Sequence, residues 1–314
     1  HLEANNLSLW MDATGAGPET SLFGNVLERG IGHTPHGDRF AHACGLEVVL
    51  PDGRLLRTGF GHYAQAQAAQ VYPYGIGPCL DGLFTQSNLG IVTKMTFWLL
   101  PKPEAFKAFF FFADHEDQIG PLIEALRPLR LRGTLCTPIH IGNDLRLLSM
   151  DRGYPWEAME GRTPLSPDVR TALCRRHGVR AWTGSGALYG SRAEVAAAEK
   201  EVRKALKRVP GLRGPIFLDD RRMAWIEAGQ RLLERLGMGG RLAPVIRKLR
   251  MAYDLLKGKP PETCVRGGLW RVRQDSDKRK DTGPGRLSGD PRDQDGGFFW
   301  ISPVLPMTEA HLRR

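Results

Sequence analysis

The chain has 314 residues, enough for two domains with separate cores, and its 41% hydrophobic and 25% charged residues are typical of a globular protein. No apolar run approaches the roughly 18 residues of a membrane helix, so the sequence excludes a membrane-spanning helix. The net charge is +10, and five scattered cysteines without a Cys-x-x-Cys pair exclude a disulfide framework and a zinc–cysteine site, which favours a reducing, cytoplasmic location.

The first hundred residues predict mainly strands. Residues 2–12 resemble the end of a helix that leads into a strand at Leu7–Met11. The turn Pro51-Asp52-Gly53 predicts a hairpin of residues 46–50 and 54–58, because proline fixes the first turn angle and glycine adopts positive φ. A ten-residue strand is expected over Ile91–Leu100, and its apolar residues on both faces indicate a covered sheet. Pro101 and Pro103 then mark a domain boundary.

Strands and helices alternate after this boundary, which predicts an α+β domain. Phe106–Phe112 is a predicted strand, and a helix with Asp114 as its cap follows it. Ser166-Pro167 and Ser191–Glu194 predict the starts of two more helices. The remaining predicted elements are helices over Met223–Leu236 and Leu242–Leu256 and strands over Ala187–Tyr189 and Phe298–Ser302. The segment Asp275–Gly297 has one large apolar residue and predicts a mobile or disordered insert.

Glycines beside Ser, Thr and Asn gather in four blocks. The blocks read GNVLERGIGHTPHGD (24–38), CGLEVVLPDGRLLRTGFG (44–61), YPYGIGP (72–78) and DGLFTQSNLGIVTKMTFWLLPKPEAF (81–106). Glycine lets the backbone approach a bound group closely, so these turns suggest N–H groups that face a polar ligand such as a pyrophosphate or the edge of a flavin ring. Loop chemistry alone leaves the ligand unidentified.

In this order and spacing, the four blocks resemble the vanillyl-alcohol oxidase and p-cresol methylhydroxylase (4-cresol dehydrogenase) family of FAD-linked oxidoreductases. Weaker similarity continues at 127–133, 186–190 and 298–306. The resemblance implies an α+β fold: the later part of a p-cresol methylhydroxylase (PCMH)-type FAD-binding domain over 1–101, then a cap (substrate) domain with an antiparallel sheet flanked by helices over 102–314. It also implies an internal fragment that lacks the phosphate-loop segment before it and the closing segment after it.

The resemblance also implies which residues contact FAD. They are Ser21, Gly24, Asn25, Glu28, Gly30 and Ile31 in the first block and Asn88, Gly90, Ile91 and Val92 in the last. The glycines would let backbone amides reach the cofactor, and the aliphatic residues would offer flat apolar contact. Glu28 would hold a cofactor hydroxyl or fix the turn. The alternative is that these glycines only close tight turns.

Reactions in this family transfer a hydride from the benzylic carbon of a para-substituted phenol to flavin N5, and oxygen or a cytochrome then takes the electrons. Buried donors favour the phenolate that drives hydride loss. On this alignment those donors lie outside the chain, so no catalytic residue is assigned. Family members are often homodimers, which implies a homodimer for the full-length protein. The open alternatives are a 2-hydroxy-acid or sugar-alcohol oxidase of the same superfamily, and an inactive fragment or basic binding module.

The basic-module alternative comes from the charge distribution. The first 100 residues hold five Lys or Arg and eight Asp or Glu, a net charge of −3, so the remainder carries +13. Such a half could attract nucleic acid or anionic lipid. Aromatic residues are not interleaved with the basic ones as a single-strand groove requires. We therefore interpret it as a solvated arginine-rich surface and expect neither nucleic acid nor a membrane as a partner.

The chain departs from the family pattern in two places. Several members carry an acidic residue shortly before the Gly-Asn pair, where this chain has Gly15 or Ala16, and the other departure lies in the first block. His33 and His36 stand where tyrosine is common, and Arg39 replaces a usual histidine. Three imidazoles and a carboxylate, from His33, His36, Asp38 and His42, are donors that suit zinc. His-x-x-His on a turn is weak geometry for a metal, so we predict no metal site.

Overall fold

The computed structural model describes residues 1–15, 17, 20–151, 153–237, 243–260, 270 and 304–312. The chain divides into two compact units, His1–Lys102 with Asp254–Pro260, and Pro103–Tyr253 with Pro261–Arg314. The short segment Asp254–Pro260 thus groups with the first unit, whereas the sequence pattern assigned it to the second domain. The predicted insert at 275–297 and the predicted strand at 298–302 lie outside the described residues. Within the described part, no helix is long and apolar enough to cross a membrane.

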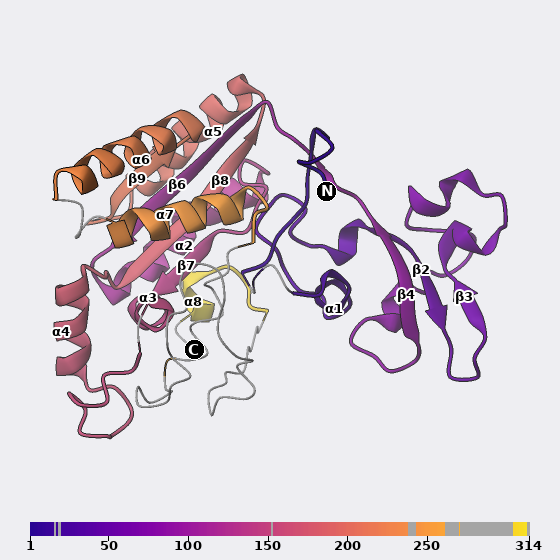
Figure 1. Ribbon diagram of the computed structural model, residues 1–314, viewed down its shortest axis with the longest axis horizontal. Coiled ribbons are helices and arrows are strands. Elements are labelled where there is room, and N and C mark those ends of the chain that lie inside the picture. Colours follow the sequence, from indigo (N-terminus) through magenta and orange to yellow (C-terminus); the bar gives the residue numbers. More distant parts are fainter. Residues whose placement is uncertain are drawn as a thin grey trace. The chain divides into compact units, whose positions relative to one another are not determined.

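The first unit is built on a three-stranded antiparallel sheet with the order β3-β2-β4 (Figure 1). The predicted hairpin is confirmed: Gly53 has a φ of +83°, and its N–H donates to Leu50 O at 2.9 Å. Leu46, Val48 and Phe84 form the buried core of this sheet. The strands of this sheet are β2 (Ala43–Val49), β3 (Leu55–Arg57) and β4 (Ile91–Phe97). Two further strands of two residues each, β1 (Leu9–Trp10) and β5 (Leu100–Pro101), pair with each other in an antiparallel arrangement.

Two predictions for this unit were wrong in detail. The ten-residue strand divides into β4 and β5, because β4 pairs with β2 whereas β5 pairs with β1. The sheet was also predicted to be covered on both faces. The side chain of Ile91 is 72% exposed, so the described residues do not cover it. Among the described residues of His1–Lys102, the α-helix is α1 (Leu22–Leu27), and 3₁₀ turns lie at Phe40–His42, Gly59–His62, Gln67–Gln70 and Asp81–Phe84.

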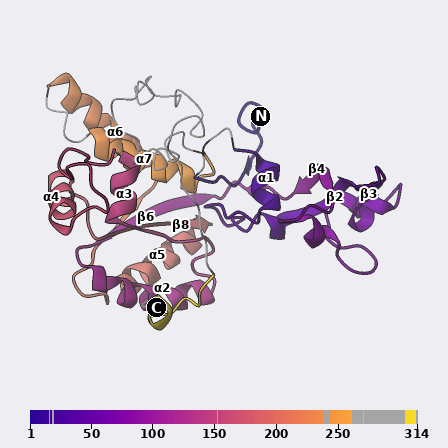
Figure 2. The same ribbon diagram turned by 90° about the horizontal axis from the view of Figure 1, so that it is seen from below.

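The second unit is a four-stranded antiparallel sheet with the order β7-β8-β6-β9, flanked by helices. Helices α2 and α5 cover one face of this sheet, and α6 and α7 lie on the other (Figure 2). This arrangement confirms the predicted fold class. The strands are β6 (Ala105–Ala113), β7 (His140–Asn143), β8 (Trp182–Gly190) and β9 (Arg213–Leu218). The helices are α2 (Ile119–Leu131), α3 (Asp144–Asp151), α4 (Pro167–His177), α5 (Arg192–Leu206), α6 (Asp220–Arg235), α7 (Ala243–Leu256) and α8 (Glu309–Leu312).

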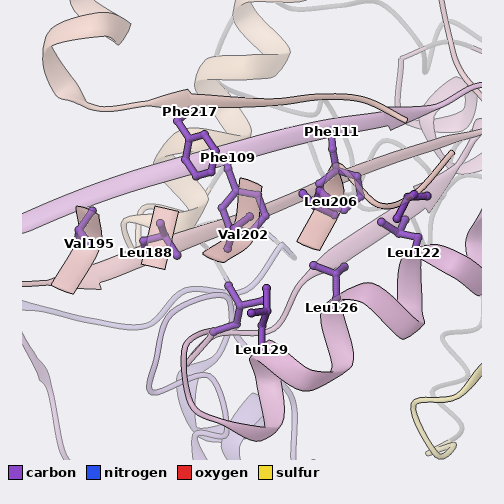
Figure 3. Close-up of a cluster of buried hydrophobic side chains, with 12 residues drawn as sticks. Phe109, Phe111, Leu122, Leu126, Leu129, Leu188, Val195, Val202, Leu206 and Phe217 are labelled. Carbon is purple, nitrogen blue, oxygen red and sulfur yellow. The ribbon is translucent and has the colours of Figure 1, made fainter. Parts of the chain in front are cut away.

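The core of the second unit lies between the sheet and α2 and α5 (Figure 3). Alternation along β6 places Phe109 and Phe111 in this core. They stack with their ring centroids 6.3 Å apart. Gly184 on β8 leaves room for the Phe111 ring, because a Cβ there would overlap it. The helices complete the core with Leu122, Leu126 and Leu129 from α2 and Val195, Val202 and Leu206 from α5.

The predicted helix starts were right at two places and wrong at one. Ser166 caps α4 by accepting from the Val169 N–H, and Ser191 and Glu194 form the predicted capping box of α5. Asp114 does not cap α2. Its carboxylate instead accepts from Arg180 and Arg213, each at 2.8 Å, and the 3₁₀ turn Glu116–Gln118 precedes the helix.

Candidate cofactor site

Four of the predicted FAD contacts lie in or at the ends of α1. Ser21 is its N-cap, and the Ser21 Oγ accepts from the Gly24 N–H at 3.0 Å. Asn25 lies inside the helix, and Glu28 is its C-cap. Arg29 then adopts a left-handed φ of +51°, and the Gly30 N–H donates back to Asn25 O at 2.7 Å. The chain therefore turns sharply after α1, between Glu28 and Gly30.

The second predicted segment is joined to the end of this helix by hydrogen bonds. The Gln86 N–H donates to Leu27 O at 2.9 Å, and its side-chain amide donates to Glu28 O at 3.3 Å. The Arg29 guanidinium donates to Thr85 Oγ1 through Nε at 3.0 Å and through Nη2 at 2.8 Å. Gln86 is also left-handed, with a φ of +49°. The two blocks, about 60 residues apart in sequence, thus meet at one junction.

After this junction, the last two predicted contact residues, Ile91 and Val92, are the first residues of β4. Ile91 pairs with Val49, and Val92 pairs with Val48, so both belong to the central ladder of the first unit. Gly90 packs directly on β2: a Cβ there would lie 2.6 Å from Val48 Cγ1 and 3.0 Å from Val49 O. Packing within the sheet therefore requires glycine at this position, whether or not a cofactor is near.

Apolar side chains are exposed beside both halves of the junction. Ile31 is 64% exposed, Ile91 is 72% exposed and Leu89 is 51% exposed, and the neighbouring Asn88 is also exposed. These residues are therefore accessible to a ligand with an apolar face.

A buried ion pair that no sequence motif predicts contacts α1 through Asn25. Asp12 and Arg39 are each 7% exposed, and Arg39 Nε donates to Asp12 Oδ2 at 2.7 Å. Arg39 also donates to Asn25 Oδ1 at 3.0 Å, which links the pair to a predicted contact. Gly32 packs against this pair, since a Cβ there would overlap the Asp12 carboxylate, but the sequence alone carries no signal for that contact.

A second buried acid, Asp81, lies at the start of the last block. It is 3% exposed, and burial raises its pKa, although hydrogen bonds from Thr58 and from the Gly45 backbone oppose this shift. Its Oδ1 has no hydrogen-bond partner in the described part of the chain. Through Thr58 and Gly45, the acid anchors the 81–84 turn to the sheet.

The histidines of the first block stack on each other. The rings of His36 and His42 lie 4.0 Å apart with an interplanar angle of 21°, and His42 Nδ1 lies 2.8 Å from Asp38 O. Burial lowers the pKa of His36, and the neighbouring His42 lowers it further. Among the described residues, no group of three or more His, Cys, Asp or Glu side chains is arranged to hold a metal ion.

Known proteins show the same sequence pattern and fold. No protein-family model matches the chain. It is 37% identical over 313 residues to a 1'-carboxy-chondrochloren decarboxylase from Chondromyces crocatus, covering 99% of this chain and 55% of that protein. It is 35% identical over 221 residues to the flavoprotein subunit of a 4-cresol dehydrogenase [hydroxylating] from Pseudomonas putida, covering 67% of this chain and 40% of that protein. The chain therefore spans about half the length of the curated relatives it matches.

Solved structures of similar fold point to the same group of proteins as the sequence matches. Substrate-bound p-cresol methylhydroxylase matches with a TM-score of 0.72 and 29% identity, and 4-ethylphenol oxidase from Gulosibacter chungangensis matches with a TM-score of 0.72 and 27% identity. Each match covers 86% of this chain and 48% of the other. With the sequence matches and the fold in agreement, the chain belongs to the vanillyl-alcohol oxidase and p-cresol methylhydroxylase family of FAD-linked oxidoreductases.

Proposed function

We propose that the protein is an FAD-dependent oxidoreductase that takes a hydride from the benzylic carbon of a para-substituted phenol or a related aryl alcohol. The observation that carries this proposal is the junction at Leu27–Arg29 and Thr85–Gln86, which brings two glycine-rich blocks of the first unit together. The names of the 4-cresol dehydrogenase, p-cresol methylhydroxylase and 4-ethylphenol oxidase relatives support the substrate class.

The predicted contact residues in and beside this junction in the sequence fit a flavin in their chemistry. Ile31 and Ile91 expose aliphatic surface, as a flat ring system requires, and the exposed Glu28 carboxylate can accept from ribityl or ribose hydroxyls. The bound flavin would supply the hydride acceptor. The proposed cofactor residues are Ser21, Gly24, Asn25, Glu28, Gly30, Ile31, Asn88, Gly90, Ile91 and Val92. We propose further that 1–101 is the flavin-domain part and 102–314 the cap part.

The other properties of the full protein are proposals as well. Oxygen or a cytochrome would take the electrons from the reduced flavin, the protein would be a cytoplasmic homodimer, and its catalytic residues are not assigned. A 2-hydroxy-acid or sugar-alcohol oxidase of the same superfamily is the nearest alternative substrate class.

A second candidate function is decarboxylation. The relative that matches over 99% of this chain is named a decarboxylase, and its identity of 37% is above the 35% of the dehydrogenase subunit. In that case a carboxylated aryl substrate would lose carbon dioxide in the flavin site.

The test uses the protein encoded by the complete reading frame that contains this sequence. We expect a yellow protein whose flavin absorption is bleached anaerobically by a 4-alkylphenol. Bleaching by lactate or glycolate, with no response to phenols, would replace the phenolic substrate with a hydroxy acid. Release of carbon dioxide from a carboxylated phenol would establish the decarboxylase. A folded protein without bound FAD contradicts the proposed function, and salt-sensitive binding to nucleic acid would then favour a basic binding module.

A further inference from the structure

The buried pair of Asp12 and Arg39 belongs to a network of hydrogen bonds that contacts α1 through Asn25. Asp12 Oδ1 accepts from the backbone N–H groups of His33 at 3.0 Å and Thr34 at 2.8 Å, and from Thr34 Oγ1 at 2.7 Å. Asp12 Oδ2 accepts from Arg39 Nε at 2.7 Å, and Asp12 O accepts from Arg39 Nη2 at 2.8 Å. The carboxylate is therefore satisfied on both oxygens, which a buried charge requires.

The remaining Arg39 nitrogen reaches a predicted cofactor contact. Arg39 Nη1 donates to Asn25 Oδ1 at 3.0 Å. Because a guanidinium only donates, the Asn25 atom that faces it must be the carbonyl oxygen, and this fixes the orientation of the amide. The amide NH₂ then points to Gly30, where a Cβ would overlap it. Asn25 is thus held between Arg39 on one side and the Gly30 backbone on the other.

Through Asn25, this network contacts α1, whose C-terminal end lies at the junction with Thr85 and Gln86. Asn25 lies within α1, and its backbone carbonyl accepts from the Gly30 N–H at 2.7 Å. The backbone carbonyl of Leu27, the last helical residue, accepts from the Gln86 N–H. The Asn25 side-chain amide also lies against the Gly30 backbone, so the orientation that Arg39 gives to this amide determines how closely the Gly30–Ile31 turn can pack on α1. Replacing a buried ion pair with apolar groups is often neutral for stability, so stability alone gives little reason for a charge pair at this position.

We propose that Asp12 and Arg39 are positioning residues that orient the Asn25 amide and thereby hold the Gly30–Ile31 turn in the conformation that binds FAD. The proposal rests on the proposed function. The pair acts through Asn25, and neither Asp12 nor Arg39 is assigned a contact with the cofactor.

The experiment compares FAD dissociation constants, measured by flavin fluorescence, for the complete protein and four variants. D12N/R39M removes both charges together, so no buried charge is left unpaired. N25A removes the amide, and D12N/R39M/N25A combines the changes. The control, D144N/R170M, neutralises the ion pair in the second unit in which Arg170 donates to both Asp144 oxygens at 2.6 and 2.7 Å. Thermal melts establish that each variant is folded.

We expect D12N/R39M and N25A each to weaken FAD binding roughly tenfold, and the combined variant to be no weaker than N25A, because coupled residues are not additive. The control should bind like the wild type. Equal affinity in D12N/R39M and wild type, or a hundredfold loss in the combined variant, overturns the positioning role. If D12N/R39M does not fold, R39K takes its place, since lysine keeps the charge but lacks the fork that reaches Asn25. A folded wild type that takes up no FAD overturns the proposed function and the positioning role with it.

Discussion

Single glycines in the first unit leave room for the side chains of the candidate site, because a Cβ at these positions would overlap them. Gly32 is the clearest case, because its missing Cβ leaves the space that the Asp12 carboxylate occupies. We predict that Gly32→Ala displaces Asp12 from Arg39 and costs about 3–5 kcal/mol of unfolding free energy, as broken buried ion pairs do. Chemical denaturation measures this loss.

Gly82 is the matched control for that substitution. It lies in the same unit, and no atom lies within 4 Å of a Cβ built on it. Gly82→Ala should therefore change the unfolding free energy by less than about 1 kcal/mol. If both substitutions have the same small effect, the carboxylate is not held as the structure shows.

Asp81 gives a prediction that depends on pH. Burial raises its pKa, so the ionised carboxyl is less favourable in the folded than in the unfolded protein. The stability that it contributes is full below its unfolded pKa of about 4 and is lost as pH rises through the folded pKa. Asp81→Asn, which keeps the shape, should therefore raise the melting temperature relative to wild type more at pH 8 than at pH 4.

Asp52 is the control of opposite sign. Hydrogen bonds from the Arg54 backbone and side chain lower the pKa of this exposed carboxyl. The stability that it contributes is lost as pH falls, so the melting-temperature difference between Asp52→Asn and wild type should not rise toward pH 8. Parallel curves for the Asp81 and Asp52 variants would show that burial of Asp81 has no effect on stability.

Among the elements, α2 separates a buried from an exposed face within one helix. Leu126 is fully buried in the core of the second unit, and Leu131 at the end of the same helix is 78% exposed. We predict that Leu126→Ala costs about 2–5 kcal/mol through lost burial and a cavity. Leu131→Ala should stay within about 0.5 kcal/mol of wild type. Urea denaturation of both variants measures the difference, and equal losses would contradict the assigned core.

Elements with local signals could be predicted from the sequence. Ser166 and Ser191 start α4 and α5 as expected, because a cap is a short-range interaction within one turn of helix. The short strands β7 and β9 could not, because four and six residues carry little periodicity and their pairing with β8 and β6 is tertiary. Asp114 was misassigned for the same reason: its partners Arg180 and Arg213 come from distant segments.

The site shows the same limit. The resemblance named Asn25 and the residues around it, but the partners of Asn25 depend on contacts across loops. Asp12 and Arg39 are 27 residues apart, and no spacing rule links them. The junction of Arg29 with Thr85 spans 56 residues and is likewise a product of the fold. The sequence blocks therefore predict which segments contact the cofactor, and the structure shows the hydrogen bonds that join these segments.

For the whole molecule, family membership rests on agreement between sequence and fold over most of this chain, while the relatives are about twice as long. The central claim is that two separate turns of the first unit contact a single cofactor. An experimental structure of the FAD-loaded complete protein tests this most directly. The account predicts that residues of 21–31 and of 88–92 both lie within contact distance of the same FAD molecule. An FAD that contacts neither segment, or only one of them, would contradict it.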